Sequence, residues 1–326
     1  MLRCEEIVIT ADKMLAARSL LTRARAAGLT GTLGARAVVA GGGCVAFAAY
    51  KKAHCAPAAA AAKAEEPAPP TLAQRCLAEA VGTAIIVQGG CGVVCAAKYA
   101  GSGATIFGIA CGWGMSVALA VYATRAISGA HLNPAVTCAL AATGKSPTEE
   151  APPYILAQLV GATVAAAVNY ACFAPGIAAF EASAGLVRGA AGSAASYAGA
   201  FAMVPNAALM GVGGALAAEV WMTGILVFLI MALTDADTGS VPDAAAPPLI
   251  GATVATLICT FGPVTGCGMN PARDLGPRLI TLLAGWGTVA AEAAWVYTLG
   301  PVAGAILGAT MYDQLFRGVA PKKEAN

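Results

Sequence analysis

Two copies of one short motif offer the clearest chemistry in the chain. Asn133-Pro134-Ala135 and Asn270-Pro271-Ala272 each place a preferred helix-capping residue before a proline, which suits the first turn of a helix. Each asparagine can donate N–H groups to a passing oxygen atom. If the two helix N-termini face each other, their positive dipole ends repel cations, whereas a neutral molecule can exchange its hydration for hydrogen bonds.

Matched segments precede the two motifs. Ser-Gly-Ala-His-Leu fills positions 128–132, and Thr-Gly-Cys-Gly-Met fills positions 265–269. We expect both segments to be non-helical backbone at membrane depth, which is tolerated only inside protein or along a wet cavity. Their carbonyl groups would then offer acceptors along a path. The residues expected to line it here are Gly129, Ala130, His131, Gly266 and Gly268.

The elements that must hold these loops are predicted to lie in a membrane. Of the 326 residues, 58% are hydrophobic and only 11% are charged, and the mean hydropathy is +0.72. A soluble domain carries about a quarter charged residues, so lipid must be the main solvent. We predict spans at 73–97, 104–124, 152–173, 209–233, 247–262 and 293–316, half-spans at 133–143 and 270–283, and a loop over 174–207.

An internal duplication organises these spans. Leu77-Ala78-Glu79 opens one half and Ala217-Ala218-Glu219 opens the other, and each half then runs on to its own Asn-Pro-Ala motif. Each half holds three spans and one half-span. Because three is odd, the second half must enter the membrane upside down, which predicts an inverted repeat with broken helices near the midplane.

Basic residues predict how the chain is oriented. With an even number of spans, the basic residues before span one, between spans two and three, and after span six share one face. By the positive-inside rule that face is cytoplasmic. These residues are Lys63, Arg75, Arg125, Lys145, Arg317, Lys322 and Lys323.

At this point the sequence resembles the major intrinsic protein, or aquaporin, family, and within it the glycerol-facilitator branch. The resemblance covers residues 73–316 and is carried by segments 128–137, 231–235 and 262–278. It implies an all-α membrane protein with six transmembrane helices, two re-entrant half-helices, one pore per protomer and a homotetramer. Asp274 directly after Arg273 is typical of the glycerol branch, whereas Tyr297 and Thr298 stand where facilitators tend to have Pro-Leu.

The resemblance also assigns the narrow filter position by position. It implies that Trp113, Ile258, Cys267 and Arg273 form the filter, which lacks the histidine of water-only pores. One large apolar wall and one charged donor suit an amphipathic polyol. The set is also similar to that of plant nodulin-like channels. As support for the loops, the resemblance implies Glu79 and Glu219 as acceptors of backbone bonds, and Asp274 is expected to order the loop near Arg273.

These observations predict a passive channel for glycerol, other small neutral solutes and water that excludes ions and protons. The alternatives are a channel for urea or metalloid acids, a mainly water-conducting aquaporin, an ion-coupled secondary transporter, and a structural junction with an occluded pore. No nucleophile–base set or metal-ligand cluster is visible, so an enzyme, a cofactor and a metal are not expected. The eleven scattered cysteines fit small hydrophobic packing, and a net charge of +2 gives no argument for nucleic acid.

The N-terminal segment differs from the rest of the chain. Between Asp12 and Glu65 it has no acidic residue, and residues 14–28 could form a basic amphipathic helix. This pattern fits a transit peptide or a disordered basic tail. We therefore expect an extension over 1–70, a channel domain over 71–318 and a tail over 319–326. The membrane would be the plasma membrane, or a mitochondrial or plastid one if 1–70 is a transit segment.

Overall fold

The computed structural model describes residues 68–237, 241–317 and 319. The basic amphipathic helix predicted at 14–28 lies outside the described residues, as do nearly all of the predicted extension and tail. Within the described part, apart from one isolated β-bridge between Ala198 and Ala202, the regular structure is helical. This confirms the predicted all-α class.

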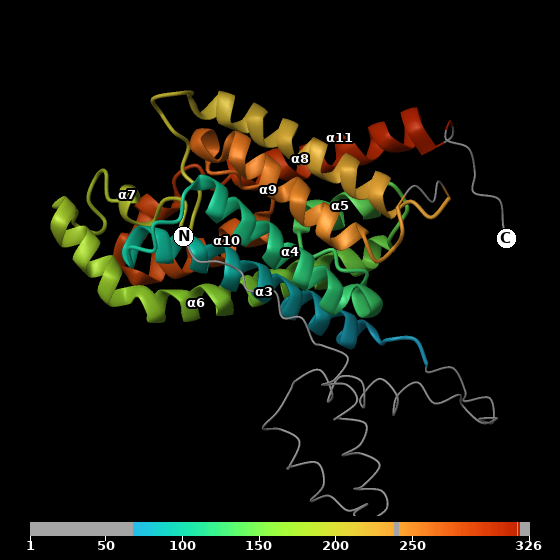
Figure 1. Ribbon diagram of the computed structural model, residues 1–326, viewed down its shortest axis with the longest axis horizontal. Coiled ribbons are helices and arrows are strands. Elements are labelled where there is room, and N and C mark those ends of the chain that lie inside the picture. The colour runs from blue at the N-terminus through green and yellow to red at the C-terminus, as the bar shows by residue number, and fades with distance from the viewer. Residues whose placement is uncertain (1–67, 238–240, 318, 320–326) are drawn as a thin grey trace, which may run out of the picture. The chain divides into compact units, whose positions relative to one another are not determined.

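Six long helices and two short ones build this part of the chain (Figure 1). The long helices are α3 (Leu72–Tyr99), α4 (Ile106–Ser128), α6 (Ala151–Ala184), α8 (Val212–Thr234), α9 (Ala246–Thr265) and α11 (Val296–Tyr312). The short ones are α5 (Pro134–Ala142) and α10 (Pro271–Thr281), one after each Asn-Pro-Ala motif. Single turns complete the order, at η1 (Thr148–Glu150), α7 (Ala194–Tyr197), η2 (Leu282–Trp286), η3 (Gly287–Ala291) and η4 (Asp313–Arg317).

Length and composition support six crossings. Five described helices are long and apolar enough to span a membrane. The number rises to six if the bent pair of segments Pro271–Ala291 and Val296–Arg317 is counted as one span. The α11 helix has only 17 residues. It continues through η4 to Arg317, which extends it to about 33 Å, enough for a bilayer core.

One predicted loop is in part wrong. Residues 174–184, which were expected to be irregular because of their Gly, Ala and Ser content, continue α6 to a length of 34 residues. At 1.5 Å per residue this helix is about 51 Å long, so its last turns project beyond a ~30 Å bilayer core. Gly176 packs against the end of α3, where an added Cβ would lie 2.6 Å from the Tyr99 carbonyl oxygen. Gly185 ends the helix at φ +63°.

Close contacts between helices explain the abundance of small residues. A Cβ on Gly161 of α6 would lie 2.0 Å from the Ala80 carbonyl oxygen of α3. The matched contact in the second half is Gly304 of α11, whose Cβ would lie 2.2 Å from the Val220 carbonyl oxygen of α8. Backbone meets backbone at both places, which only small residues allow. The same helix pair is therefore built twice, as the inverted repeat predicts.

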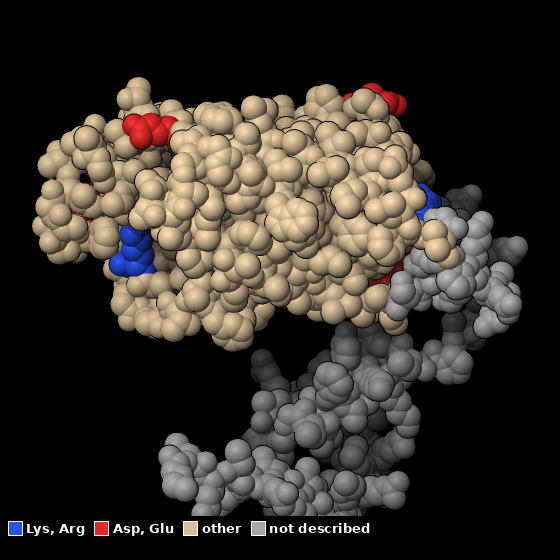
Figure 2. Space-filling view, turned by 90° about the horizontal axis from the view of Figure 1, so that it is seen from above, with Lys and Arg blue, Asp and Glu red and all other residues tan. Residues whose placement is uncertain are grey.

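Charged side chains gather at the two ends of the helical bundle. On the face drawn in Figure 2, a broad uncharged surface lies between them. At one end Arg75 pairs with Glu150, and Lys145 pairs with Asp313. Arg125 donates to the Asp243 carbonyl at the same end. We call this the Lys145 end; it gathers the described basic residues that were predicted to share one face. At the opposite end, Arg188 pairs with Glu181 at 2.9 Å.

Candidate functional site

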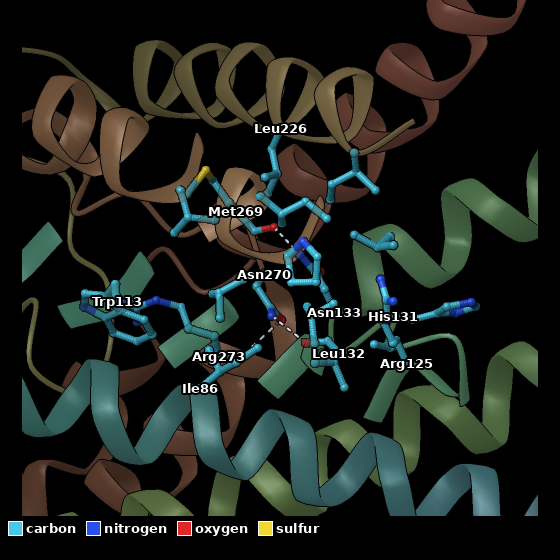
Figure 3. Close-up of a pocket in the computed structure, with 18 of the residues that line it drawn as sticks. Ile86, Trp113, Arg125, His131, Leu132, Asn133, Leu226, Met269, Asn270 and Arg273 are labelled. Atoms are coloured by element: carbon cyan, nitrogen blue, oxygen red, sulfur yellow. Dashed lines mark hydrogen bonds between the residues drawn. The ribbon is translucent and has the colours of Figure 1, made fainter. Parts of the chain in front are cut away.

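The two Asn-Pro-Ala motifs meet inside the bundle (Figure 3). Asn133 caps α5 by accepting from the Ala135 N–H at 2.8 Å, and Asn270 caps α10 by accepting from the Ala272 N–H at 3.0 Å. Each amide also reaches across to the other loop. Asn133 Nδ2 donates to the Met269 carbonyl, and Asn270 Nδ2 donates to the Leu132 carbonyl, both at 2.9 Å. Each amide therefore keeps a second N–H that these bonds do not use.

The loops before the motifs adopt the same unusual backbone. Ala130 and Leu132 in the first loop, and Cys267 and Met269 in the second, have φ between +52° and +61°. Side chains other than glycine seldom adopt this conformation, and it persists only when the surroundings hold it in place. No local sequence pattern predicts this alternation, because none of these four residue types favours a positive φ.

Two buried glutamates hold these loops. Glu79 accepts from the backbone N–H of His131 at 2.9 Å and from that of Leu132 at 2.6 Å. Glu219 accepts from the N–H of Gly268 and of Met269, both at 2.9 Å. Both glutamates have no exposed surface. A carboxylate with only donors around it has the partners that an ionised carboxyl group needs in a low-dielectric interior.

The first loop has extra partners that sequence reasoning missed. Gln158 Nε2 donates to Glu79 at 2.7 Å and to Thr137 Oγ1 at 3.0 Å. Thr137 gives its own proton to the Asn133 carbonyl at 3.1 Å. The His131 Nδ1 atom lies 3.2 Å from the same Thr137 Oγ1. No sequence pattern near residues 158 and 137 predicts their role at this loop, because only the tertiary structure brings them together.

A cavity of about 230 Å³ runs along the two loops. Its wall includes Trp113, Ile258, Cys267 and Arg273, which are the four predicted filter residues, together with Asn133 and Asn270. Gly129, Ala130, His131 and Gly268 of the loops also line it, whereas Gly266 does not. Gly266 instead packs against Met203, where an added Cβ would lie 2.7 Å from the sulfur. Towards the Lys145 end, the wall continues through Arg125, Thr234 and Ala246.

An arginine and a tryptophan face each other across one part of this wall. The guanidinium carbon of Arg273 lies 4.2 Å from the Trp113 ring centroid. Arg273 is only 5% exposed, and within the described residues its Nη1 atom has no hydrogen-bond partner. Gly90 makes room for the indole, because an added Cβ would lie 2.0 Å from Trp113 Cε3. The site therefore combines an apolar ring with an unused charged donor.

Cys267 and Asp274 have neighbours that the sequence did not predict. The Cys267 sulfur lies 3.4 Å from the Met222 sulfur, and the residue is 1% exposed. Asp274 pairs with Arg278 at 2.8 Å and accepts from the Met203 N–H at 2.7 Å. Arg278 also donates to the Met203 carbonyl at 2.8 Å. This buried ion pair thus anchors the connection around Met203, which in turn covers the second loop at Gly266.

An apolar helical bundle with two re-entrant half-helices meeting beside an internal cavity defines a membrane channel. The sequence model of the major intrinsic protein family matches residues 68–312. The chain therefore belongs to the major intrinsic protein family.

Relatives and a solved structure agree with this assignment. The chain is 42% identical over 257 residues to a glycerol uptake facilitator protein of Haemophilus influenzae, covering 77% of this chain and 97% of that protein. It is 42% identical over 248 residues to the propanediol uptake facilitator of Salmonella typhimurium, covering 74% and 93%. The aquaglyceroporin structure from Plasmodium falciparum matches with a TM-score of 0.67 at 25% identity, covering 77% of this chain and 99% of that one.

Proposed function

We propose that this protein is a passive channel for glycerol, other small neutral solutes and water, and that it excludes ions and protons. The observation that carries the proposal is the Trp113–Arg273 pair in the cavity wall. Glycerol has one carbon-rich side and one hydroxyl-rich side, which this pair can contact at the same time. The names of the relatives, which refer to glycerol and propanediol uptake, point to the same solute class.

Exclusion of ions follows from the charges along the path. The N-termini of α5 and α10 meet at Asn133 and Asn270, and each contributes about half a positive charge. Arg273 adds a full positive charge in the same wall. A cation that has lost its hydration is repelled by this positive field. A neutral solute exchanges one hydrogen bond for the next.

The alternative functions require different chemical groups in the cavity wall. A channel for urea or metalloid acids, or one that conducts mainly water, would use the same wall with a different order of permeabilities. An ion-coupled transporter needs ionisable groups along the path. In the described lining these are Arg125, His131 and Arg273, together with the Cys267 thiol, whereas Glu79 and Glu219 are occupied by loop N–H groups.

Stopped-flow shrink–swell measurements on proteoliposomes test this proposal. Glycerol gradients should give fluxes well above those of protein-free vesicles, and potassium or proton gradients should not. Water flux without glycerol flux would refute the glycerol assignment. Replacing Arg273 or Trp113 should change the order of glycerol, urea and water permeabilities, and an unchanged order in both variants would remove these residues from the filter.

We also propose a homotetramer with one pore per protomer, which the family membership supports. The described helices expose many large apolar side chains, including Leu77, Phe107, Met115, Leu156 and Trp221, each more than 60% exposed. Lipid or neighbouring subunits must cover them. Chemical cross-linking in native membranes should give a ladder that ends at four subunits, and a ladder that ends at one would contradict the assembly.

For the ends of the chain we propose that 71–318 form the channel, that 1–70 are an extension with a possible targeting role, and that 319–326 are a tail. The absence of acidic residues between Asp12 and Glu65 supports the targeting role. Fusion of residues 1–70 to a fluorescent reporter tests it. Organellar import would support a mitochondrial or plastid membrane, whereas a diffuse cytosolic reporter would favour the plasma membrane.

A further inference from the structure

Two arginines line the cavity without an acidic partner. In the described part of the chain, four arginines each pair with a carboxylate, and these are Arg75, Arg188, Arg278 and Arg317. The other two described arginines, Arg125 and Arg273, form no such pair, and both belong to the cavity wall. A charge that no carboxylate neutralises can act on a solute that passes it. Arg273 already has a part in the proposed function, whereas Arg125 has none.

Arg125 ends a stripe of wall residues on α4. The members, which line the cavity at every fourth residue and therefore share one face of the helix, are Trp113, Val117, Val121 and Arg125. At a rise of 1.5 Å per residue, α4 separates Trp113 from Arg125 by about 18 Å. Figure 3 shows these two residues on opposite sides of the central asparagines. Because Arg273 lies over Trp113, the two unpaired arginines serve different halves of the cavity.

The spans around Arg125 offer a solute almost no hydrogen bonds. Within the described lining, Arg125 is the only charged side chain that α4, α8 and α9 contribute. Their aliphatic contributions are Val117, Val121, Leu226, Ile230, Ile250 and Val254. A polyol that moves beside such side chains gives up hydrogen bonds to water and gains none from them. A polar group at the end of this wall can replace part of that loss.

Backbone carbonyl groups hold the Arg125 side chain in place. Arg125 Nη1 donates to the Asp243 carbonyl at 2.5 Å, on the connection that leads into α9. The Tyr122 hydroxyl, from the same end of α4, donates to the next carbonyl, that of Ala244. A carbonyl fixes the guanidinium without cancelling its charge, and this bond uses one of its five N–H groups. Both side chains therefore attach the same segment, but only Arg125 is part of the described cavity wall.

We propose that Arg125 forms a second binding subsite, for polyol hydroxyl groups, at the Lys145 end of the path. Its guanidinium donates to a hydroxyl oxygen as the solute enters or leaves the apolar part of the cavity. Thr234 in the same part of the wall gives its own proton to the Ile230 carbonyl at 2.8 Å, so its oxygen can accept from a solute hydroxyl. The inference rests on the proposed function, because it assumes that polyols pass along this wall.

The shared attachment of Tyr122 and Arg125 gives the experiment its control. Full-length wild-type protein, Arg125→Met, Arg125→Lys and Tyr122→Phe are reconstituted in liposomes. Permeabilities are measured for glycerol and for propane-1,2-diol, which has the same carbon chain and one hydroxyl fewer, together with thermal unfolding in detergent. We expect R125M to lower glycerol permeability about fivefold and diol permeability at most about twofold, because methionine keeps the length of the side chain but not its donors.

The other two variants separate solute binding from attachment of the connection. R125K keeps a cationic donor and should retain at least about half of the wild-type glycerol permeability. Y122F should keep the wild-type values for both solutes, although it also releases a carbonyl of the connection. Because Arg125 is exposed, R125M should unfold close to the wild-type temperature.

Several results would overturn the subsite. These are unchanged glycerol permeability in R125M, equal falls for glycerol and the diol, a loss in R125K as large as in R125M, or the same loss in Y122F, which would show that only the attachment matters. Wild-type liposomes with no glycerol flux would instead refute the proposed function itself, so the two failures can be distinguished.

Discussion

Replacing Glu219 by glutamine tests how the second pore loop is held. One carboxylate oxygen accepts from Thr265 Oγ1 at 2.8 Å and from the Gly268 N–H at 2.9 Å. The other accepts from the Met269 N–H at 2.9 Å. Glutamine keeps one acceptor oxygen and puts an amide N–H₂ in the other place. Whichever way the amide turns, at least one loop N–H then faces a second donor inside the protein.

The structure sets the size of the effect. A buried N–H left without an acceptor costs about 1–3 kcal/mol, and turning the remaining two charge-assisted bonds into neutral ones loses about 1 kcal/mol each. Glu219→Gln should therefore destabilise the fold by about 3–5 kcal/mol. The loop at Cys267 should also become mobile, which lowers glycerol permeability in the vesicle assay. Unfolding by heat or denaturant in detergent measures the first effect.

A matched control lies one turn further along the same helix. Thr223 is fully buried, and its hydroxyl has no hydrogen-bond partner in the described residues. Thr223→Val should leave stability unchanged or slightly increase it, because it removes an unsatisfied polar atom without changing the shape. If the free energy of unfolding of Glu219→Gln lies within about 0.5 kcal/mol of the wild-type value, the carboxyl group does not hold the loop as an ionised acceptor.

Three further predictions concern the wall, the central motifs and the Lys145 end. Gly90→Ala should reduce glycerol permeability about tenfold, because a methyl group 2.0 Å from Trp113 Cε3 forces the indole to move; normal flux would show that the indole position does not matter. Asn270→Asp keeps the helix cap but replaces the donor to the Leu132 carbonyl by a negative charge. A cation leak should therefore appear in a potassium-flux assay, and no leak would contradict the exclusion of cations by the positive helix ends. A double-mutant cycle on the partly exposed pair Lys145–Asp313 should give a coupling of only about 0.5–1 kcal/mol in thermal unfolding; a coupling above 2 kcal/mol would refute this estimate.

The sequence by itself determined the membrane class, the repeat and the two central motifs. Apolar segments of about bilayer length have one favourable solvent, and an odd number of spans per half forces the inversion. Asparagine followed by proline encodes a helix start locally. These features depend on residues that are near one another in the chain, which is why they can be recognised without a structure. The glutamates at 79 and 219 were also visible, because a charge in an apolar span needs partners.

Only the tertiary structure decided how the loops are held and what faces the cavity. Gln158, Tyr154 and Tyr297 reach loops that lie far from them in sequence, so no local pattern marks them. The length of α6 was misjudged because a Gly- and Ala-rich segment is ambiguous until a neighbour such as Tyr99 packs against it. Packing also decided that Cys267 lies against Met222 and that Asp274 holds the Met203 connection. Such contacts depend on the distance between helices, which backbone contacts at small residues fix only once the whole bundle has assembled.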